Sequence, residues 1–294
     1  MRVAILGAGK MGTWFAKFFL KEGSTVVVAD RNKEKLAKLK EELGIETADF
    51  ADAVLNADWV FLCVSINALE GVVKKISPVV RGGQIVMDIA SIKEGPVNVM
   101  HEYIRDGLVL GTHPVFGPGS KGVEHKAFIL TPTNDVEAEF ASTFKKWLEK
   151  RKARVFVLTP NRHDELMSIV LGFPHFLGLV ACDTLLDQSS FPETKKVAGT
   201  TYRMLFTLAE ATALENPELF ATLQMNLPDI DRIEREFMKK SQEWLDIIRR
   251  KDQEAIVSRM EQLKSKLMKE SLDFTRSYEI MYKMLEATEN SDSS

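Results

Sequence analysis

The chain has 294 residues, which is long for one hydrophobic core and sufficient for two domains. Charged residues make up 28% of it and hydrophobic residues 45%, an ordinary balance for a soluble globular protein. The formal net charge of -3 gives no electrostatic basis for binding nucleic acid or an anionic membrane surface. We therefore expect the partners to be small molecules.

The start of the chain and its cysteines bear on the cellular compartment. An apolar run follows Met1 and Arg2 directly, without a signal-like segment, which favours a cytoplasmic protein. The two cysteines, Cys63 and Cys182, are far apart and form no recognisable disulfide framework or metal-binding pattern. We expect no metal site.

The most informative segment is a glycine-rich turn. Residues 7–12 read GAGKMG and lie between an apolar run, residues 3–6, and an amphipathic helical pattern, residues 13–21. In such a turn the first glycine permits a tight bend, the second lets the backbone approach a pyrophosphate, and the third packs the helix on the strand. The pattern predicts a dinucleotide-binding turn; the alternative is a glycine turn in an ordinary βαβ unit. The predicted cofactor contacts are Gly7, Gly9, Lys10, Met11 and Gly12.

An acidic residue follows at the expected place. A second apolar run, residues 25–29, ends at Asp30, eighteen positions after Gly12, where a carboxylate can accept from a ribose 2′-hydroxyl. Because this carboxylate would repel a 2′-phosphate, the sequence favours NAD over NADP. Arg31, which we include among the cofactor contacts, and Lys33 weaken that preference, since both can approach such a phosphate.

The first half alternates short β-branched runs with helical patterns. This alternation predicts a parallel, doubly wound Rossmann-type sheet with helices on both faces, within a domain of residues 1–159. The predicted strands are residues 3–6, 25–29, 59–64, 84–89, 108–111, 127–130 and 154–157. The predicted helices are residues 13–21, 33–43, 68–76, 97–104 and 136–150.

Strand signals disappear after Thr159, and helical periodicity predicts an all-helical domain over residues 160–288. Two apolar stripes at helical spacing supply more apolar surface than a small bundle readily covers, so a homodimer is predicted. They are Ile230, Ile233 and Phe237 in one helix, and Ile256, Met260, Leu263 and Leu267 in another. The polar residues 289–294 are predicted to be a disordered tail or a linker.

An uncharged stretch, residues 166–182, has the minimum length for a membrane span. It contains Pro174 and His175 and is flanked by acidic residues on both sides. These features predict instead a helix buried on all sides in the helical domain.

Two polar residues follow predicted strands at the sheet edge where open α/β folds bind ligands. His113 lies in LVLGTHPVFGP, and Pro114 favours an extended geometry for it. With an ordinary pKa near neutrality, an imidazole can remove a hydroxyl proton as hydride leaves the same carbon; the alternative is a loop histidine that caps local backbone. Ser91 either hydrogen-bonds the substrate hydroxyl or His113, or starts a helix through its capping-box spacing to Glu94.

The helical half contains two further candidates. His175, in GFPHF, is by its sequence context more typical of a satisfied core residue than of a ligand. Arg203, in GTTYRMLF, has apolar neighbours, so its guanidinium requires an anion. That anion is either a structural carboxylate such as that of Glu210 or a substrate carboxylate.

Taken together, the motifs resemble those of the prephenate dehydrogenase (TyrA) family of tyrosine biosynthesis. In chain order they are GAGKMG, SIK, HPVFGP, HDE followed by PHF, and YR upstream of NPELF. The resemblance covers nearly the whole chain, and HPVFGP with the YR segment is far more specific than the glycine turn. It implies a Rossmann domain followed by a helical dimerisation domain, and oxidative decarboxylation of prephenate to 4-hydroxyphenylpyruvate with a nicotinamide cofactor.

The resemblance also implies roles for single residues. The matches are His113 to the catalytic histidine, Ser91 to the active-site serine, His175 to a histidine lining the substrate pocket, and Arg203, with Tyr202 beside it, to the group that binds the substrate carboxylate. Some family members carry a second histidine three positions before the one matching His175, where this chain has Gly172.

Several alternatives stay open at this point. Arogenate dehydrogenase, or a cyclohexadienyl enzyme that takes both substrates, differs only at the side-chain keto or amino group. HPVFGP argues against a β-hydroxyacid dehydrogenase and a reduced-deazaflavin:NADP oxidoreductase. A regulatory protein that senses NAD without turnover would not need His113, Ser91 and Arg203 together. Feedback control by tyrosine, and fusion to another pathway enzyme beyond Ser294, are also left open.

Overall fold

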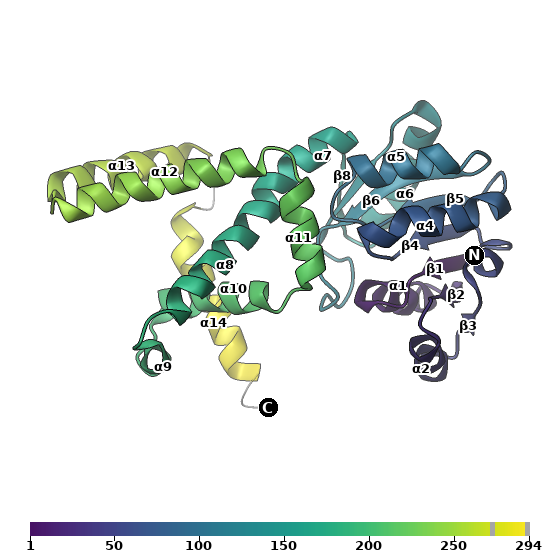
Figure 1. Ribbon diagram of the computed structural model, residues 1–294, viewed down its shortest axis with the longest axis horizontal. Helices are drawn as coiled ribbons and strands as arrows, with labels where there is room; N and C mark the ends of the chain where they lie inside the picture. Colours follow the sequence, from purple (N-terminus) through teal and green to yellow (C-terminus); the bar gives the residue numbers. More distant parts are fainter. Residues whose placement is uncertain (271–273, 292–294) are drawn as a thin grey trace. The chain divides into compact units, whose positions relative to one another are not determined.

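The computed structural model describes residues 1–270 and 274–291, and the chain divides into two compact units (Figure 1). The first unit comprises Met1–Met167 and Ala221–Pro228, and the second comprises Ser168–Phe220 and Asp229–Ser294. The first unit therefore extends past the predicted boundary at residue 159 and includes helix α7 (Pro160–Met167).

The first unit contains an eight-stranded sheet in the order β3-β2-β1-β4-β5-β6-β7-β8. The strand order reverses between β1 and β4, and this switch point is where open α/β sheets bind ligands, so the glycine turn after β1 is placed there. The strands are β1 (Arg2–Leu6), β2 (Thr25–Ala29), β3 (Glu46–Thr47), β4 (Trp59–Leu62), β5 (Ile85–Asp88), β6 (Leu108–Pro114), β7 (Ala127–Thr131) and β8 (Arg154–Val157).

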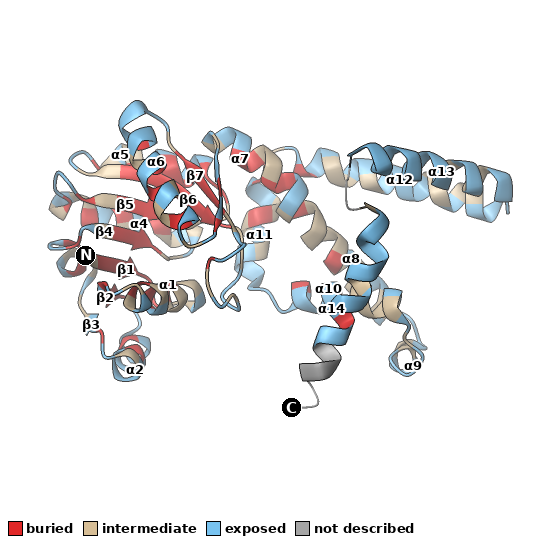
Figure 2. Ribbon diagram, turned by 180° about the vertical axis from the view of Figure 1, so that it is seen from behind, coloured by how far each residue is buried: buried red, intermediate tan, exposed pale blue. Residues whose placement is uncertain are grey.

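Helices cover both faces of this sheet and produce two hydrophobic cores. One face packs against α1 (Lys10–Lys21), α2 (Lys33–Leu43) and α6 (Asp135–Glu149). The other packs against α3 (Phe50–Val54), α4 (Ile66–Ile76) and α5 (Glu94–Tyr103). The central strands are buried on both sides (Figure 2), which explains why their sequences are continuous apolar runs rather than alternating ones.

The prediction of a wholly parallel sheet is wrong at one strand pair. Strands β6 and β7 are antiparallel, and His113 lies opposite Ile129 in their register. The connection between them, residues 115–126, contains no helix, whereas a parallel return normally needs a helical crossover. Strand β6 also extends beyond its predicted end to Pro114, so His113 lies inside the strand rather than past it.

The second unit is helical, as predicted. Helices α8 and α10 pack closely because Gly178 has no side chain; a Cβ there would lie 2.5 Å from Thr212 Oγ1. A π-helical turn, Ser168–Gly172, precedes α8. Its α-helices are α8 (Phe173–Leu186), α9 (Phe191–Thr194), α10 (Thr200–Ala213), α12 (Ile230–Arg249), α13 (Gln253–Glu270) and α14 (Ser277–Ser291). Helix α11 (Pro217–Asn226) begins in the second unit and ends in the first.

The prediction that residues 166–182 are buried on all sides is wrong for the single chain. Pro160–Leu186 is long and apolar enough to cross a membrane by length and composition alone, and only 11% of its apolar window is buried. Ile169 and Val170 are 55% and 56% exposed. Apolar composition predicts that a surface is removed from water but does not identify the chain that covers it.

The two predicted apolar stripes differ in burial. Phe237 of the first packs against Phe173 and Phe176 of α8, with ring centroids 5.4 and 6.4 Å apart. Leu263 and Leu267 of the second, on α13, are each 46% exposed. The intrachain core of the second unit therefore uses the first stripe and leaves much of the second uncovered.

The predicted C-terminal tail begins inside a helix. Helix α14 continues to Ser291, so residues 289–291 are helical rather than disordered. Residues 292–294 lie outside the described part of the chain.

Candidate active site

The glycine turn has the geometry that its sequence predicts. Gly7 has a φ of +116°, and a Cβ at Gly12 would lie 1.8 Å from the carbonyl oxygen of Gly7. These two glycines are thus required by the bend and by the packing of α1. A Cβ at Gly9 would meet no described atom within 4 Å, so the backbone there is open to a ligand. Gly9 is also the N-cap of α1 and offers no capping side chain, which leaves the first N–H groups of the helix to bind an anion.

Asp30 closes the turn from the end of β2. Its carboxylate accepts from the backbone N–H of Ala8 at 2.6 Å and from that of Asn32 at 2.7 Å. Of its two basic neighbours, Lys33 forms an ion pair with Asp49 at 2.7 Å, whereas Arg31 is exposed. Arg31 is therefore the neighbour better placed to meet a phosphate.

His113 is part of a buried chain of three side chains. Its Nδ1 lies 2.8 Å from Nε2 of His163, and Nδ1 of His163 lies 2.7 Å from Oδ1 of Asp164. His163 and Asp164 belong to α7, which explains why α7 packs with the first unit. All three residues are less than 5% exposed.

Asp164 also caps helix α5. Its two carboxylate oxygens accept from the backbone N–H groups of Lys93 at 2.7 Å and Glu94 at 3.0 Å. This contact replaces the predicted capping box, so that alternative role for Ser91 is wrong. The Ser91 hydroxyl has no hydrogen-bond partner among the described residues, and it lies in the segment between β5 and α5.

Lys93 and Asp88 form a buried ion pair next to the strand that carries His113. Lys93 is fully buried, and its Nζ donates to the Asp88 carboxylate and, at 2.6 Å, to the carbonyl oxygen of Thr112. Asp88 ends β5 and Thr112 precedes His113 in β6, so Lys93 ties the ends of these two strands together. The position of His113 is consequently fixed by groups with little freedom to move.

This environment favours the neutral form of His113. Burial lowers the pKa of His113 well below its ordinary value, and the charges of His163 and Lys93 act in the same direction. Burial also lowers the pKa of His163, although Asp164 opposes that shift. The direction of this shift differs from the near-neutral pKa expected from the sequence, because the imidazole is buried and lies near the charge of Lys93.

The Asp164 carboxylate defines the tautomers of the two histidines. Asp164 accepts the proton of His163 Nδ1, so Nε2 of a neutral His163 is an acceptor. His113 must then donate through Nδ1, which leaves a lone pair on its Nε2. The arrangement can take a proton at His113 Nε2 and stabilise the resulting charge through His163 and Asp164.

The candidates of the second unit lie on α8 and α10. His175 Nδ1 donates to the carbonyl oxygen of Leu171 at 2.6 Å, which leaves its Nε2 as an acceptor. The Tyr202 hydroxyl is 2.7 Å from Thr194 Oγ1. Arg203 is partly buried on α10.

The proposed structural partner of Arg203 has another ion pair. Glu210 Oε1 lies 3.1 Å from Lys195 Nζ. Glu210, the structural carboxylate considered from the sequence, thus pairs with Lys195 on the exposed surface.

Sequence reasoning from single residues missed His163, Asp164 and Lys93. The available signal was the HDE segment, in which a histidine and an acid are adjacent on a helix that follows the last strand. Lys93 stood in the SIK segment but carried no expected role. In the described part of the chain, no group of three His, Cys, Asp or Glu side chains could hold a metal ion.

These features define a Rossmann-type nucleotide-binding protein with a helical second unit. The sequence matches the prephenate dehydrogenase nucleotide-binding domain over residues 15–157 and the prephenate dehydrogenase dimerization domain over residues 159–262. The chain belongs to the prephenate dehydrogenase family.

Individual relatives agree with this membership. A probable arogenate/prephenate dehydrogenase of Methanocaldococcus jannaschii is 34% identical over 87% of this chain and 58% of that protein. A cyclohexadienyl dehydrogenase of Zymomonas mobilis is 24% identical over 60% of this chain and 64% of that protein. The chain spans about three fifths of the length of these relatives.

Solved structures share the fold. Prephenate dehydrogenase of A. aeolicus, in complex with hydroxyphenyl propionate and NAD+, superposes with a TM-score of 0.76 at 24% identity, covering 92% of this chain and 98% of that one. Arogenate dehydrogenase of Synechocystis gives a TM-score of 0.71 at 18% identity, covering 92% and 99%.

Proposed function

We propose that the protein is an NAD-dependent dehydrogenase that oxidatively decarboxylates prephenate to 4-hydroxyphenylpyruvate in tyrosine biosynthesis. The observation that carries the proposal is the buried chain of His113, His163 and Asp164, which presents a neutral imidazole nitrogen with a defined tautomer. A protein that only sensed NAD would have no use for such a base.

The residues around the glycine turn fit a dinucleotide. Gly9 leaves room for a pyrophosphate, the start of α1 offers N–H groups, and Asp30 directly follows β2, where a ribose would lie. The bound nicotinamide would supply the hydride acceptor. The A. aeolicus relative was solved with NAD+, which supports NAD here, and the cofactor contacts would be those named from the sequence, including Lys10, Met11 and Arg31.

The chain's own residues would act on the proton and the carboxylate. His113 Nε2 takes the hydroxyl proton as hydride leaves the carbon that bears the hydroxyl group. The Ser91 hydroxyl is available to hydrogen-bond, and it orients either the substrate hydroxyl or His113. Loss of the ring carboxylate as carbon dioxide leaves its bonding electrons in the ring, and aromatisation drives the reaction.

The second unit would bind the rest of the substrate. Arg203 offers a planar guanidinium that matches a carboxylate, with Tyr202 beside it on α10. His175 has one ring nitrogen available as an acceptor. The keto group of the prephenate side chain needs no acidic partner in the protein, whereas the ammonium group of arogenate needs one. The names of the relatives support both substrates.

The assembly would be a cytoplasmic homodimer. The family description of the second unit is a dimerization domain, and the exposed apolar residues of α13 and of Pro160–Leu186 need a cover. A second copy supplies that cover without a membrane.

The decisive experiment mixes the full chain with NAD and prephenate and follows the absorbance of reduced nicotinamide. Turnover with release of 4-hydroxyphenylpyruvate is expected. A parallel reaction with arogenate identifies the substrate: a higher kcat/KM with arogenate would overturn the choice of prephenate. Binding of NAD without turnover of either substrate would instead support the sensor.

A further inference from the structure

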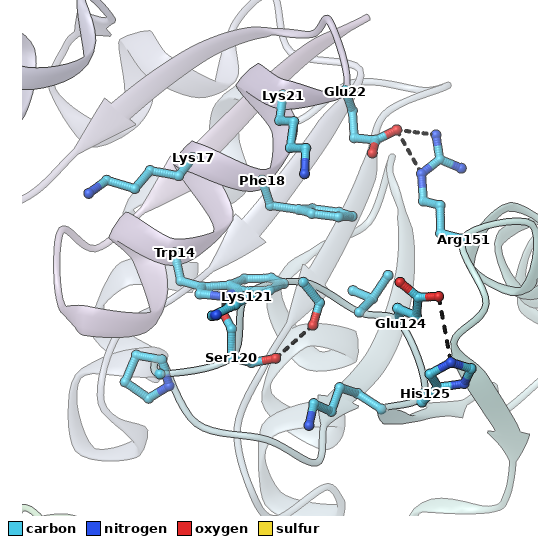
Figure 3. A pocket seen from close by; sticks show the side chains of 15 residues that line it. Trp14, Lys17, Phe18, Lys21, Glu22, Ser120, Lys121, Glu124, His125 and Arg151 are labelled. Carbon is cyan, nitrogen blue, oxygen red and sulfur yellow. Dashed lines mark hydrogen bonds and ion pairs between the residues drawn. The ribbon is translucent and has the colours of Figure 1, made fainter. Parts of the chain in front are cut away.

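A cavity on the first unit is lined by no residue of the glycine turn and by neither Ser91 nor His113 (Figure 3). It shares only Pro118 with the hollow that Ala8, Gly9 and Lys10 line. It is formed by α1, by residues 118–126 of the connection after β6, and by Arg151. Its volume of about 940 Å³ is within the range of small-molecule pockets, about 300 to 1,000 Å³. Nothing in the proposed reaction uses it.

One wall of the cavity is aromatic. The rings of Trp14 and Phe18 are stacked, with centroids 5.2 Å apart and planes inclined by 13°. Trp14 Nε1 donates to the carbonyl oxygen of Ser120 at 2.6 Å, and Ser120 Oγ donates to that of Gly122 at 2.7 Å. These bonds hold the connection against α1, so the aromatic wall is preformed.

The rim of the cavity is cationic. Its lining contains five Lys or Arg side chains but only two carboxylates, in a chain whose net charge is -3. Both carboxylates are already engaged, since Glu22 accepts from Arg151 Nε at 2.7 Å and Glu124 pairs with Lys152 at 2.7 Å.

Of the four remaining cations, Lys17 pairs with Glu42 at 2.6 Å, and the other three have no counterion among the described residues. Within residues 1–270 and 274–291, Lys21, Lys121 and Lys126 form no ion pair. In Figure 3 the Lys21 side chain points towards the Phe18 ring. Like charges gathered at one concave surface repel each other, and an anion bound among them removes that cost.

We propose that this cavity binds a planar aromatic anion carrying two or three negative charges. Its ring packs against Phe18 and Trp14, and its anionic groups meet Lys21, Lys121 and Lys126. Carboxylate and phosphate oxygens share the chemistry that ammonium groups recognise, so aromatic carboxylates and nucleotides are two sources of one class.

The test is isothermal titration calorimetry of the full chain saturated with NAD, using benzene-1,3,5-tricarboxylate as the probe and ADP as the nucleotide probe. We expect one site per chain for at least one of the probes, with an affinity that falls as salt is raised. Citrate, a trianion without a ring, should bind more weakly than the tricarboxylate.

Variants locate the site. Lys21→Gln and Lys121→Gln should each weaken binding by about two- to fivefold, as expected for exposed ion pairs. Phe18→Leu, which removes the ring, should weaken binding as well. The matched control is Lys40→Gln, an exposed lysine of α2 outside the cavity, and it should bind like the parent.

Thermal unfolding verifies that each variant is folded. The proposal is overturned if neither probe binds, if citrate binds as tightly as the tricarboxylate, or if the cavity variants bind like Lys40→Gln. All three outcomes are independent of dehydrogenase activity, so failure here is distinguishable from failure of the proposed reaction.

Discussion

His163 places an acceptor nitrogen 2.8 Å from Nδ1 of His113. Because its other nitrogen is held by Asp164 at 2.7 Å, the orientation of the imidazole in β6 is set by a carboxylate two side chains away. Asp164 in turn is fixed by the start of α5. Asp164 therefore aligns the proposed base through His163 and also caps helix α5.

We expect His163 to act as a positioning residue. His163→Phe keeps the ring but removes the acceptor, so kcat should fall by about 10- to 100-fold while the KM for prephenate changes little. His163→Gln retains an acceptor and should recover part of the rate. A purely structural role would lower the melting temperature of both variants without separating their kcat values, and that result would contradict the prediction.

His113→Asn should lower kcat by about 100-fold or more, because the amide keeps a polar group but cannot take the proton. The pH profile of the parent gives a second check. Since the pKa of His113 is lowered by burial, the neutral base persists as the pH falls, and kcat/KM should hold through pH ~6.5 and decline only below it. An acidic limb at or above that pH, or one unchanged in His113→Asn, would assign the proton to another group.

Much of the first unit was predictable because its signals are local. Apolar runs bounded by turns predicted β1, β2 and β8 within about one residue, and GAGKMG predicted the turn. The short β3 and α3 were missed, since two- and five-residue elements carry no periodicity. The antiparallel β6–β7 pair was missed because a run of apolar residues predicts a strand but not its direction.

The site was predictable residue by residue but not as an assembly. In the sequence His113 and Ser91 stand out because they come at the end of apolar runs. The roles of His163 and Asp164 depend instead on α7 folding back onto α5 and β6. That packing joins positions 50 residues apart, which no local pattern encodes. The burial that lowers the pKa of His113 is likewise a tertiary property.

The cofactor preference depends on Asp30 and Arg31. We expect a higher kcat/KM with NAD than with NADP, because Asp30 would repel a 2′-phosphate. Arg31→Ala should lower kcat/KM with NADP more than kcat/KM with NAD. Lys33→Ala is the matched control, since Lys33 is paired with Asp49, and it should alter neither value. Equal or higher kcat/KM with NADP in the parent would refute the preference.

The exposed stripe of α13 predicts the assembly. Light scattering should report twice the chain mass of 33.1 kDa at micromolar concentration. Leu263→Glu places a charge on the apolar stripe and should shift the protein towards monomer. Val136→Glu, at a 66% exposed apolar position of α6, is the control and should remain dimeric. A monomeric parent, or equal effects of the two substitutions, would exclude the proposed interface.

Arg203→Ala tests the carboxylate anchor. Loss of a charged hydrogen-bonding partner should cost about 2 to 5 kcal/mol if the bound group is desolvated, which appears as a raised KM for prephenate with unchanged affinity for NAD. Glu210→Gln is the control: Glu210 pairs with Lys195, so its substitution should leave the KM for prephenate unaltered. If Arg203→Ala fails to fold, or binds NAD poorly while its KM for prephenate is unchanged, Arg203 belongs to the scaffold.

Arg203→Lys separates charge from geometry, because an ammonium retains the charge but cannot form the bidentate pair. A KM between those of the parent and Arg203→Ala is therefore expected for Arg203→Lys.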